Sequence, residues 1–360
     1  MPRHLFADIS AHGLGHLAQA APILNRLHER LPGLRLTVRS SLPDDRLRQR
    51  IAVPFSHIPG ASDFGYAMVD ALTIDHAATA ATYRVAHADF SQRVADEAAR
   101  LRTLQVDAVF SDVAYLPLAA AAQAGIPAVA LCSLNWADLF RHYYGGEAWA
   151  KPIHAEMLAA YRSALFLRTT PGMPMPCLER QMTIGPIARL GRERRTALRQ
   201  KVGVGGTARL GLIALGGIPT RLPVEHWPVQ PGTHWLVPAA WVTQRPDMHA
   251  IEPLVSPDWS FTDLLRSVDV VVTKPGYGTF TEAACNGTAV IYQRRPDWPE
   301  QDCLVDWLRA HARCAEIDGD DLSSGRLGDA LDACLAARAP PLPPPTGIED
   351  AANVLAGLLG

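Results

Sequence analysis

Short runs of aliphatic residues recur along the chain, each bounded by glycine or polar residues and separated from the next by a longer helical pattern. The run 106–112 (VDAVFSD) is followed by a helical stretch and then by 125–130 (GIPAVA). The same pattern returns without a gap 162 residues later, as 268–274 (VDVVVTK) and 287–292 (GTAVIY). Continuous β-branched runs joined by helices are typical of parallel strands buried on both faces. The repeat therefore predicts two similar α/β units.

Both halves of the chain also begin in the same way. Residues 5–10 (LFADIS) form an apolar run that leads into a glycine-containing loop and a helix predicted over 17–27. Residues 210–215 (LGLIAL) likewise lead into Gly216 and Gly217. A buried strand, a glycine-containing loop and a helix in this order are typical of Rossmann-like domains. We therefore expect an α/β protein with two Rossmann-like domains whose parallel sheets face each other across a cleft.

Proline-rich segments mark the limits of these domains. Three prolines within 171–176 forbid regular structure, and five within 340–345 give a semi-rigid, extended segment. An amphipathic helix is predicted after the second segment, at 348–359. The expected parts are an N-terminal domain over 1–170, a linker over 171–186, a C-terminal domain over 187–339, and a spacer with a final helix over 340–360.

The composition is that of a folded protein with almost no net charge. Hydrophobic residues make up 48% of the 360 residues, and 34 Lys and Arg against 36 Asp and Glu leave a formal net charge of −2. This apolar content is sufficient for buried cores. The near-neutral balance argues against general nucleic-acid binding and against a polybasic membrane anchor. Only three of the basic residues are lysines, and one of these is Lys274.

The cysteines and the apolar segments both favour a cytoplasmic protein without a transmembrane segment. The six cysteines follow neither a C-x-x-C motif nor zinc-ligand spacing, so reduced thiols are expected. Asp8 stands where a signal peptide needs an apolar segment. Residues 113–137 carry no charge and are long enough to span a bilayer, but prolines and Gly125 divide them into a helix, a turn and a strand.

Ligands bind at the carboxyl ends of the strands in open parallel sheets, so the loops that follow the predicted strands are candidates for chemistry. The first such loop, AHGLGH, contains Gly13 and Gly15, which let the backbone approach a ligand closely. His12 and His16 flank these glycines. Histidine at such a position can act as a general acid or base. His16 is the stronger candidate, because His12 can equally serve to close the turn.

Asp112 lies at the end of the matching buried strand. A carboxylate at this depth is costly unless it is paired or lies at a ligand site. It can cap the helix that follows. Alternatively, it can hydrogen-bond the distal nitrogen of His16, fixing the tautomer of the imidazole and stabilising its protonated form. The two strands would be neighbours in a doubly wound sheet.

A loop in the second half, KPGYGTFTE, runs from Lys274 to Glu282. Gly276 and Gly278 expose backbone N–H groups at a helix start, which Thr279 can cap, and this arrangement suits a diphosphate. Glu282 lies one turn into the helix and can reach the hydroxyls of a ribose. Thr279 and Glu282 also have the spacing of a capping box, and both roles can hold together. The rarity of lysine favours a specific role for Lys274.

Two further loops complete the candidate residues. Gly216 and Gly217 form a small-residue turn, and Glu300 with Gln301 can grip sugar hydroxyls by paired hydrogen bonds, although their loop could equally be a surface excursion. Phosphate-loop, H-E-x-x-H and G-x-S-x-G motifs are absent from the sequence. A turn explains the single D-x-D sequence at 318–320. No metal site is therefore predicted.

These loops together resemble those of the GT-B glycosyltransferases, particularly family 28, which includes the N-acetylglucosaminyltransferase of peptidoglycan lipid synthesis. Gly13, Gly15 and His16 match the glycine-rich turn of this family, which ends in histidine. Asp112 falls where related plant enzymes carry the aspartate that partners their catalytic histidine. The residues that match the donor-binding segments are 268–273, Gly276, Gly278, Thr279, Glu282, Ala283, Gly287, Glu300 and Gln301.

A closer resemblance is to the glycosyltransferase-like domain of plant arabinose kinases and to its stand-alone bacterial relatives. The shared segments are 12–16, 70–75, 111–113, 135–136, 276–279 and 294–297. No sugar-kinase segment follows in this sequence, so the resemblance does not imply kinase activity. The donor segment departs from the peptidoglycan enzyme at Lys274, Pro275 and Tyr277, which leaves the donor sugar and the nucleotide open.

The resemblance implies a metal-independent, inverting hexosyl- or N-acetylhexosaminyl-transferase that uses a nucleotide-diphosphate sugar, by default a UDP-sugar, as co-substrate and needs no cofactor. His16 would be the general base, and the last helix would cross back to the N-terminal domain. The acceptor could be a small molecule, a glycoside or a lipid-linked compound, and the last would bring the protein to the inner membrane surface. A nucleotide-sugar hydrolase or epimerase and a non-catalytic sugar-nucleotide-binding protein remain alternatives. The residues expected to line the acceptor pocket include Tyr66, Asp70, Asp75, Trp136, Tyr143 and Tyr144.

Overall fold

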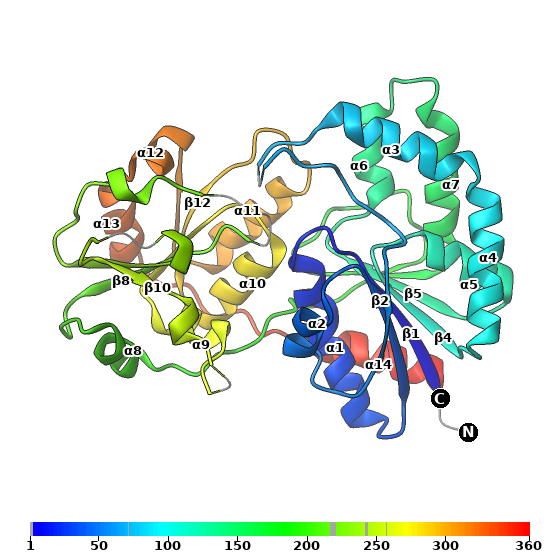
Figure 1. The fold of residues 1–360 in the computed structure, drawn as a ribbon, viewed down its shortest axis with the longest axis horizontal. Coiled ribbons are helices and arrows are strands. Elements are labelled where there is room, and N and C mark those ends of the chain that lie inside the picture. Colours follow the sequence, from blue (N-terminus) through cyan, green and yellow to red (C-terminus); the bar gives the residue numbers. More distant parts are fainter. Residues whose placement is uncertain (1–2, 71, 217–220, 242–243, 257) are drawn as a thin grey trace. The chain divides into compact units, whose positions relative to one another are not determined.

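The computed structural model describes residues 3–70, 72–216, 221–241, 244–256 and 258–360. The chain divides into two compact units (Figure 1). The N-terminal unit comprises 1–69, 73–187 and 346–360, and the C-terminal unit comprises 70–72 and 188–345. The end of the chain therefore belongs to the same unit as its beginning.

The N-terminal unit contains a seven-stranded sheet in which every pair of neighbouring strands is parallel. The strands, in their spatial order, are β3 (Ser56–Pro59), β2 (Arg35–Ser40), β1 (His4–Ile9), β4 (Ala108–Asp112), β5 (Ala128–Cys132), β6 (Leu165–Arg168) and β7 (Gln181–Thr183). The helices that connect or cover them are α1 (Gly15–Arg30), α2 (Asp44–Arg50), α3 (His76–Ala88), α4 (Phe90–Thr103), α5 (Leu116–Ala124), α6 (Trp136–Tyr144), α7 (Ala150–Arg162) and α14 (Gly347–Leu359).

The C-terminal unit repeats this architecture with a six-stranded parallel sheet. The strands, in their spatial order, are β10 (Met248–Ala250), β9 (Thr233–Val237), β8 (Arg209–Ile213), β11 (Val270–Thr273), β12 (Ala289–Gln293) and β13 (Cys314–Ile317). The α-helices are α8 (Arg195–Val202), α9 (Phe261–Ser267), α10 (Tyr277–Asn286), α11 (Gln301–His311), α12 (Gly319–Ser324) and α13 (Gly328–Ala336).

The repeat in the sequence corresponds to equivalent strands of the two sheets. β4 and β11 each lie beside the first strand of their unit, and both are buried along their whole length. Asp112 and Lys274 are 162 residues apart, so the same position of the repeat is occupied by an acidic residue in the first unit and by a basic residue in the second. Helices cover both faces of the sheets, which explains why the strands are continuously apolar and do not alternate. The predicted α/β fold with parallel sheets is confirmed.

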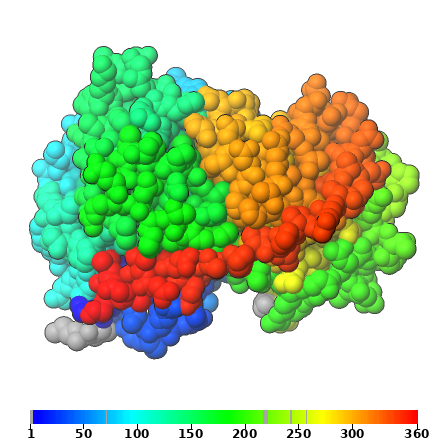
Figure 2. Space-filling model, turned by 180° about the vertical axis from the view of Figure 1, so that it is seen from behind, coloured from blue at the N-terminus to red at the C-terminus, as the bar shows by residue number. Residues whose placement is uncertain are grey.

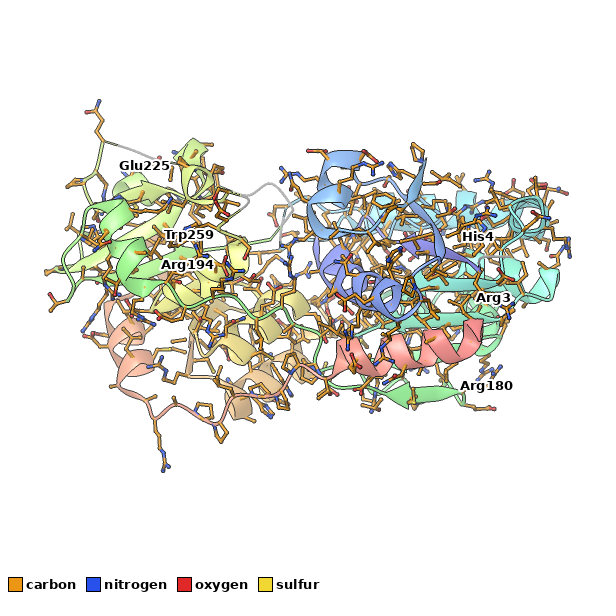
Figure 3. The ribbon with its side chains drawn as sticks, turned by 90° about the horizontal axis from the view of Figure 1, so that it is seen from below. Arg3, His4, Arg180, Arg194, Glu225 and Trp259 are labelled. Carbon is orange, nitrogen blue, oxygen red and sulfur yellow. The ribbon has the colours of Figure 1, made fainter. Side chains whose placement is uncertain are left out.

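Close packing within the C-terminal unit fixes the identity of some residues in the sheet. Gly211 in β8 faces the ring of Trp235 on the neighbouring strand β9, and a Cβ at position 211 would overlap that ring. At the edge of the same unit, the guanidinium of Arg194 lies 4.9 Å from the centre of the Trp259 ring (Figure 3). The ammonium of Lys201 lies 5.3 Å from that centre. Trp259 therefore packs against two cations, each a cation–π contact.

The last helix, α14, packs on α1 in the N-terminal unit, as predicted. Leu355 and Leu359 are buried, and Glu349 forms ion pairs with Arg26 and Arg30 of α1. Figure 2 shows the end of the chain, in red, lying on the surface of this unit. Within the described part of the chain, no helix combines the length and the apolar character that crossing a membrane requires.

Candidate active site

The topology of the N-terminal sheet brings the end of β1 next to the end of β4. Ile9 pairs with Asp112 in the parallel register. The strand order reverses here, because β2 and β3 continue the sheet beyond β1, whereas β5, β6 and β7 continue it beyond β4. Ligands of open α/β sheets bind at such a switch point. The loop after β1 leads into α1, which begins two residues earlier than predicted and therefore includes His16 in its first turn.

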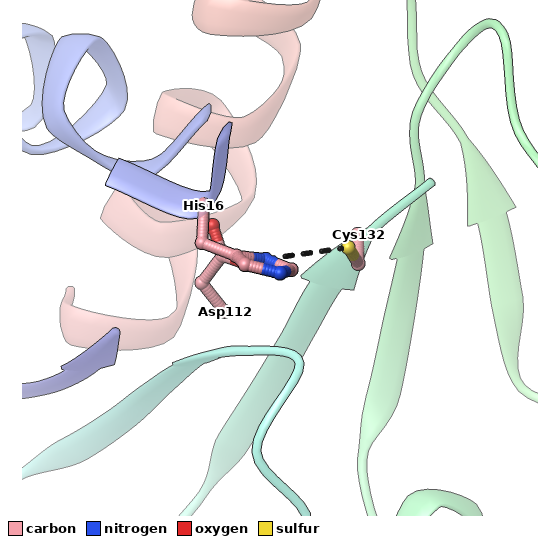
Figure 4. Close-up of side chains that lie close together, drawn as sticks. All are labelled: His16, Asp112 and Cys132. Atoms are coloured by element: carbon pink, nitrogen blue, oxygen red, sulfur yellow. Dashed lines mark hydrogen bonds and ion pairs between the residues drawn. The ribbon is translucent and has the colours of Figure 1, made fainter. Parts of the chain in front are cut away.

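His16 and Asp112 meet at this switch point. The Nδ1 atom of His16 lies 2.8 Å from Oδ1 of Asp112, and the two residues are 6% and 0% exposed (Figure 4). Asp112 does not cap the following helix, since α5 begins after Tyr115 without a side-chain cap. When the Nδ1–H group of the neutral imidazole donates a hydrogen bond to the carboxylate, Nε2 carries the lone pair. The arrangement therefore presents Nε2 as a proton acceptor.

Burial and charge act in opposite directions on His16. Burial lowers the pKa of His16, but the charge of Asp112 and its hydrogen bond outweigh this effect and hold the pKa well above its usual value of 6.5. Burial raises the pKa of Asp112 to about 6, although the neighbouring imidazolium opposes this rise. The pair therefore holds protons tightly, and the imidazole can accept a proton from a substrate only from its neutral form.

A thiol completes the surroundings of His16. Cys132, the last residue of β5, places Sγ 3.8 Å from the Nδ1 atom of His16 (Figure 4). Gln19 of α1 donates a hydrogen bond to the same sulfur at 3.9 Å. The donor atoms of His16, Asp112 and Cys132 all lie within 4.8 Å of one another.

Two further buried carboxylates of this unit pair with one arginine. Arg39 in β2 pairs with Asp8 of β1 and, at 2.6 Å, with Glu97 of α4. The hydroxyl group of Ser62 donates a hydrogen bond to Oδ1 of Asp8, with 2.7 Å between the two oxygens. Arg39 is only 5% exposed, so its charge is held in place by its two acidic partners.

Asp63 and Trp136 extend the candidate site; Trp136 was expected in the acceptor pocket, whereas sequence reasoning missed Asp63. The indole Nε1 of Trp136 donates to Oδ2 of Asp63 at 2.6 Å, while Oδ1 of Asp63 is buried and makes no hydrogen bond to the described residues. Burial raises the pKa of Asp63 to about 6, and the charge of Asp8 acts in the same direction. The edge of the Trp136 ring system contacts both histidines, with ring centres 5.5 Å from His12 and 5.8 Å from His16.

The glycine-rich loop is shaped by these aromatic contacts. Gly13 adopts a left-handed conformation with φ of +84°, which favours glycine. The ring of His12 lies so close to Gly65 that a Cβ at position 65 would be 2.7 Å from it. Gly15 begins α1 directly before His16. His12 therefore packs between Gly65 and Trp136, whereas His16 makes the contact with a carboxylate.

The other residues expected in the acceptor pocket have mixed roles. Tyr66 packs against Trp136 and Tyr143, with ring centres 5.8 and 5.3 Å apart. Asp75 instead caps α3, accepting a hydrogen bond from the backbone of residue 78 at 2.9 Å. Tyr144 donates to the backbone carbonyl of residue 76 at 3.0 Å. Asp70 accepts a hydrogen bond from the backbone N–H of residue 72 within its own loop.

The C-terminal unit has an equivalent switch point between β8 and β11. Ile213 pairs with Val272, and the loops after these strands contain Gly216 and Lys274. Gly216 has a left-handed φ of +92°, and a Cβ at this position would lie 3.9 Å from Nζ of Lys274. The ammonium therefore lies close to Gly216. Gly217, predicted with Gly216, falls outside the described residues.

α10 begins at Tyr277, with Gly276 as its N-cap and without a side-chain cap. The expectation that Thr279 caps this helix is therefore wrong, because Thr279 is the third residue of the helix and Gly278 the second. The first N–H groups of a helix have no intrahelical acceptor and favour anions. Glu282 lies in the second turn and is 5% exposed.

A cationic pair lies near Glu300 in this unit. Burial lowers the pKa of Lys274 to about 8, the charge of Arg295 acts in the same direction, and Glu300 opposes it. The Arg295 guanidinium stacks on Trp298 at 3.9 Å, and the Trp298 indole donates to Glu300 at 3.0 Å. Gln301 bonds both the backbone N–H and the carbonyl of Arg295 at 3.0 Å. Arg295 was missed as a site residue, although the two adjacent arginines at 294 and 295 were a signal.

The comparisons with solved structures agree with this architecture. A UDP-glucosyltransferase from Polygonum tinctorium, capable of glucosylating indoxyl, matches with a TM-score of 0.62 and 15% identity over 100% of this chain and 99% of that one. A Listeria monocytogenes protein assigned as a UDP-N-acetylglucosamine 2-epimerase matches with a TM-score of 0.59 and 12% identity over 99% and 95%. The fold is that of the GT-B glycosyltransferases, as the resemblance of the loops predicted.

Among curated proteins, the chain is similar to L-arabinokinase of Arabidopsis thaliana. The two are 24% identical over 332 residues, which make up 91% of this chain and 32% of the arabinokinase. The chain thus spans about a third of the length of that relative. No family model matches the sequence.

Proposed function

We propose that this protein is an inverting, metal-independent glycosyltransferase that moves a sugar from a nucleotide-diphosphate sugar to an acceptor hydroxyl. The observation that carries the proposal is the buried His16–Asp112 pair at the switch point of a GT-B fold, with Nε2 of His16 available as a proton acceptor. The default donor is a UDP-sugar. A proton-accepting side chain at this position is what attack by a hydroxyl group requires.

In the proposed reaction, the acceptor oxygen attacks the anomeric carbon of the donor while its proton moves to Nε2 of His16. The bond between the anomeric carbon and the diphosphate oxygen breaks, and its electron pair leaves with the diphosphate. Because the nucleophile enters opposite the leaving group, the anomeric configuration inverts. Asp112 stabilises the imidazolium that forms and holds the ring in the reactive tautomer.

The C-terminal unit is proposed to bind the donor. The N–H groups at the start of α10, near Gly276, Gly278 and Thr279, would bind the diphosphate together with Lys274 and the glycine turn at Gly216 and Gly217. Arg295 adds a second cation close to Lys274. These charges would take the place of a metal ion.

We assign the binding of the ribose and of the donor sugar to polar residues of the same unit. Glu282 is proposed to bind the ribose, and Glu300 with Gln301 the donor sugar. Both polar atoms of the Gln301 side chain are bonded to Arg295, so direct binding of a sugar by Gln301 requires an exchange of these partners. The arabinokinase relative is named for a sugar substrate, which agrees with a sugar ligand here.

The proposed acceptor subsite lies around Trp136 in the N-terminal unit. Oδ1 of Asp63 is buried, and we propose that a small movement of the loop would let it accept a hydrogen bond from a second hydroxyl of the acceptor, while its other oxygen stays hydrogen-bonded to the indole. An aromatic surface beside a carboxylate suits a sugar or a glycoside.

Turnover assays with a panel of UDP- and dTDP-sugars and sugar or glycoside acceptors test the proposal. His16→Ala is expected to lower kcat by about 10²- to 10⁴-fold, because it removes the general base. Asp112→Asn should lower it as well, since an amide can donate to Nδ1 and hold the wrong tautomer. His226→Ala, at an exposed position of the C-terminal unit, is the matched control and should retain activity.

The same assays separate the alternatives. Release of the nucleoside diphosphate without any acceptor would indicate a hydrolase, and interconversion of the sugar without release would indicate an epimerase. Tight donor binding without turnover of any pair would indicate a binding protein. Full transfer activity in the His16→Ala variant would contradict the assignment of the base.

A further inference from the structure

We propose that His16, Asp112 and Cys132 form a zinc-binding site, and that zinc bound there blocks the general base. The three residues come from α1, β4 and β5, and all are buried. Their imidazole, carboxylate and thiol groups are ligand types that proteins use for zinc. The binding part of the proposal stands on this geometry alone, whereas the inhibitory part rests on the proposed function.

The separations of the donor atoms lie around those of one tetrahedral ion. Zinc bonds of about 2.0–2.3 Å place the ligand atoms of a tetrahedral site roughly 3.3–3.8 Å apart. Here Nδ1 of His16 lies 3.8 Å from Sγ of Cys132 and 2.8 Å from Oδ1 of Asp112, and all three atoms are within 4.8 Å of one another. Oδ2 of Asp112 is buried and makes no hydrogen bond to the described residues, so the carboxylate has a lone-pair donor to spare. Loss of the His16–Asp112 hydrogen bond and small side-chain adjustments would therefore bring the three ligand atoms to the distances of a zinc site.

Zinc on Nδ1 determines the tautomer of His16. The metal takes the Nδ1 lone pair, so the ring can carry its proton only on Nε2. An initially neutral imidazole moves its proton from Nδ1 to Nε2, and an initially protonated one releases its Nδ1 proton to solvent. The Cys132 thiol also releases a proton as it becomes a thiolate. In either case Nε2 ends as an N–H group and cannot accept a proton from the acceptor hydroxyl.

The ligand set also selects the metal. Thiolate and imidazole favour zinc, whereas magnesium prefers oxygen ligands in an octahedral arrangement. Zinc should therefore bind and inhibit, and magnesium at the same concentration should do neither. This agrees with a transferase that works without a metal and is switched off by one.

Equilibrium zinc binding, measured by competition with a chromophoric chelator, tests the site without any turnover. Cys132→Ser should weaken zinc binding by at least about tenfold, since even the loss of a residue that only supports a ligand costs this much. Cys334→Ser is the matched control: Cys334 is equally buried but lies in the C-terminal unit. Cobalt in place of zinc should give the charge-transfer absorption of a metal–thiolate bond in the wild-type protein and in Cys334→Ser, but not in Cys132→Ser.

The outcomes distinguish the two parts of the proposal. Wild-type protein that binds no zinc, or Cys132→Ser protein that binds it as tightly as the wild type, overturns the site. If Cys132→Ser does not fold, Asp112→Asn provides the same binding test through another ligand. Inhibition is scored for each variant as the ratio of its rates with and without zinc. Zinc binding with an unchanged rate overturns the inhibitory part alone. If the protein binds zinc but shows no transfer activity even without zinc, the proposed function is wrong and the zinc site stands.

Discussion

Three aspartates lie buried at the switch point of the N-terminal unit, and their partners make them chemically different. Asp8 is neutralised by Arg39, and Asp112 is hydrogen-bonded to His16. Asp63 accepts a hydrogen bond from the neutral indole of Trp136, and the charge of His16 and the Ser10 hydroxyl only partly offset the cost of its burial. Burial makes this carboxylate costly to ionise, so its protonated form is favoured relative to an exposed aspartate. Position, rather than residue type, therefore decides which partners stabilise each of the three carboxyl groups.

This difference predicts a pH-dependent effect of Asp63→Asn on stability. Burial raises the pKa of Asp63 from 3.8 to about 6, so the folded protein holds the proton more tightly than the unfolded chain. The wild-type protein should therefore lose stability as the pH rises from about 4 to above 6. Asp63→Asn removes this loss, and its stability relative to the wild type should increase over that range by at most about 3 kcal/mol.

Urea unfolding of both proteins at pH 4, 6 and 8 measures this effect. Asp258→Asn, at an exposed position, is the control and should follow the wild-type protein at each pH. A constant difference between Asp63→Asn and the wild type across the three pH values would show that Asp63 does not bind a proton in this range.

Lys274 predicts a second pH dependence, in nucleotide binding. Burial lowers the pKa of its ammonium to about 8, so the positive charge is present at pH 7 and mostly lost at pH 9. If the ammonium binds the diphosphate, affinity for UDP should fall about tenfold between these pH values. Titration calorimetry at pH 7, 8 and 9 measures it. Lys274→Met should bind more weakly at pH 7 and show little pH dependence, whereas Lys201→Met, at an exposed lysine of α8, should behave as the wild type.

At the scale of elements, continuous apolar runs predict the strands of the sheets, whereas the last helix is held in place by contacts with residues distant in the sequence. α14 closes over α1 with Leu355 fully buried and with Glu349 paired to two arginines of α1. A short helix of this kind is marginal by itself, so packing and not propensity holds it in place.

Leu355→Ala should therefore destabilise the N-terminal unit by about 2–5 kcal/mol, the usual cost of a cavity at a buried leucine. Leu358→Ala lies on the same helix at a partly exposed position and should cost clearly less. The loss of stability of the two variants is compared by thermal unfolding and, separately, by the hydrogen-exchange protection of α1. Equal losses would mean that α14 does not pack through Leu355.

At the scale of the whole molecule, the two units share one topology but have switch points of opposite character. The N-terminal switch point contains a histidine among carboxylates, and the C-terminal one contains Lys274 and Arg295 beside a helix start. The first suits proton transfer and the second suits an anion. A base and a phosphate-binding loop on separate units are the requirements of the proposed transfer.

UDP should therefore stabilise the protein without involving His16. A ligand at one hundred times its Kd adds about 2.7 kcal/mol to the free energy of unfolding. The same gain is expected for the His16→Ala variant and in the presence of EDTA, with hydrogen-exchange protection centred on α10. No gain from UDP, dTDP or any other nucleoside diphosphate would exclude nucleotide binding by this chain.

The sequence by itself determined the α/β class and the repeat and selected the loops proposed to carry chemistry, because continuous apolar runs and glycines are local properties of the chain. It also placed α14 to within one residue, since amphipathic periodicity is local too. The first residues of helices were predicted less accurately from the sequence than the strands. α10 begins at Tyr277 because Gly276 serves as its N-cap, and the capping-box spacing of Thr279 and Glu282 did not reveal this.

Only the tertiary structure decided which of those loops meet and what each side chain does there. The sequence offered Asp112 as either a helix cap or a partner of His16, and the parallel register of β1 with β4 brings it to the histidine. Asp63 and Cys132 carried no motif, because their importance comes from neighbours distant in the chain. Burial and pairing are properties of the folded molecule, so the proton affinities of this site and the proximity of His16, Asp112 and Cys132 arise only when the sheet forms.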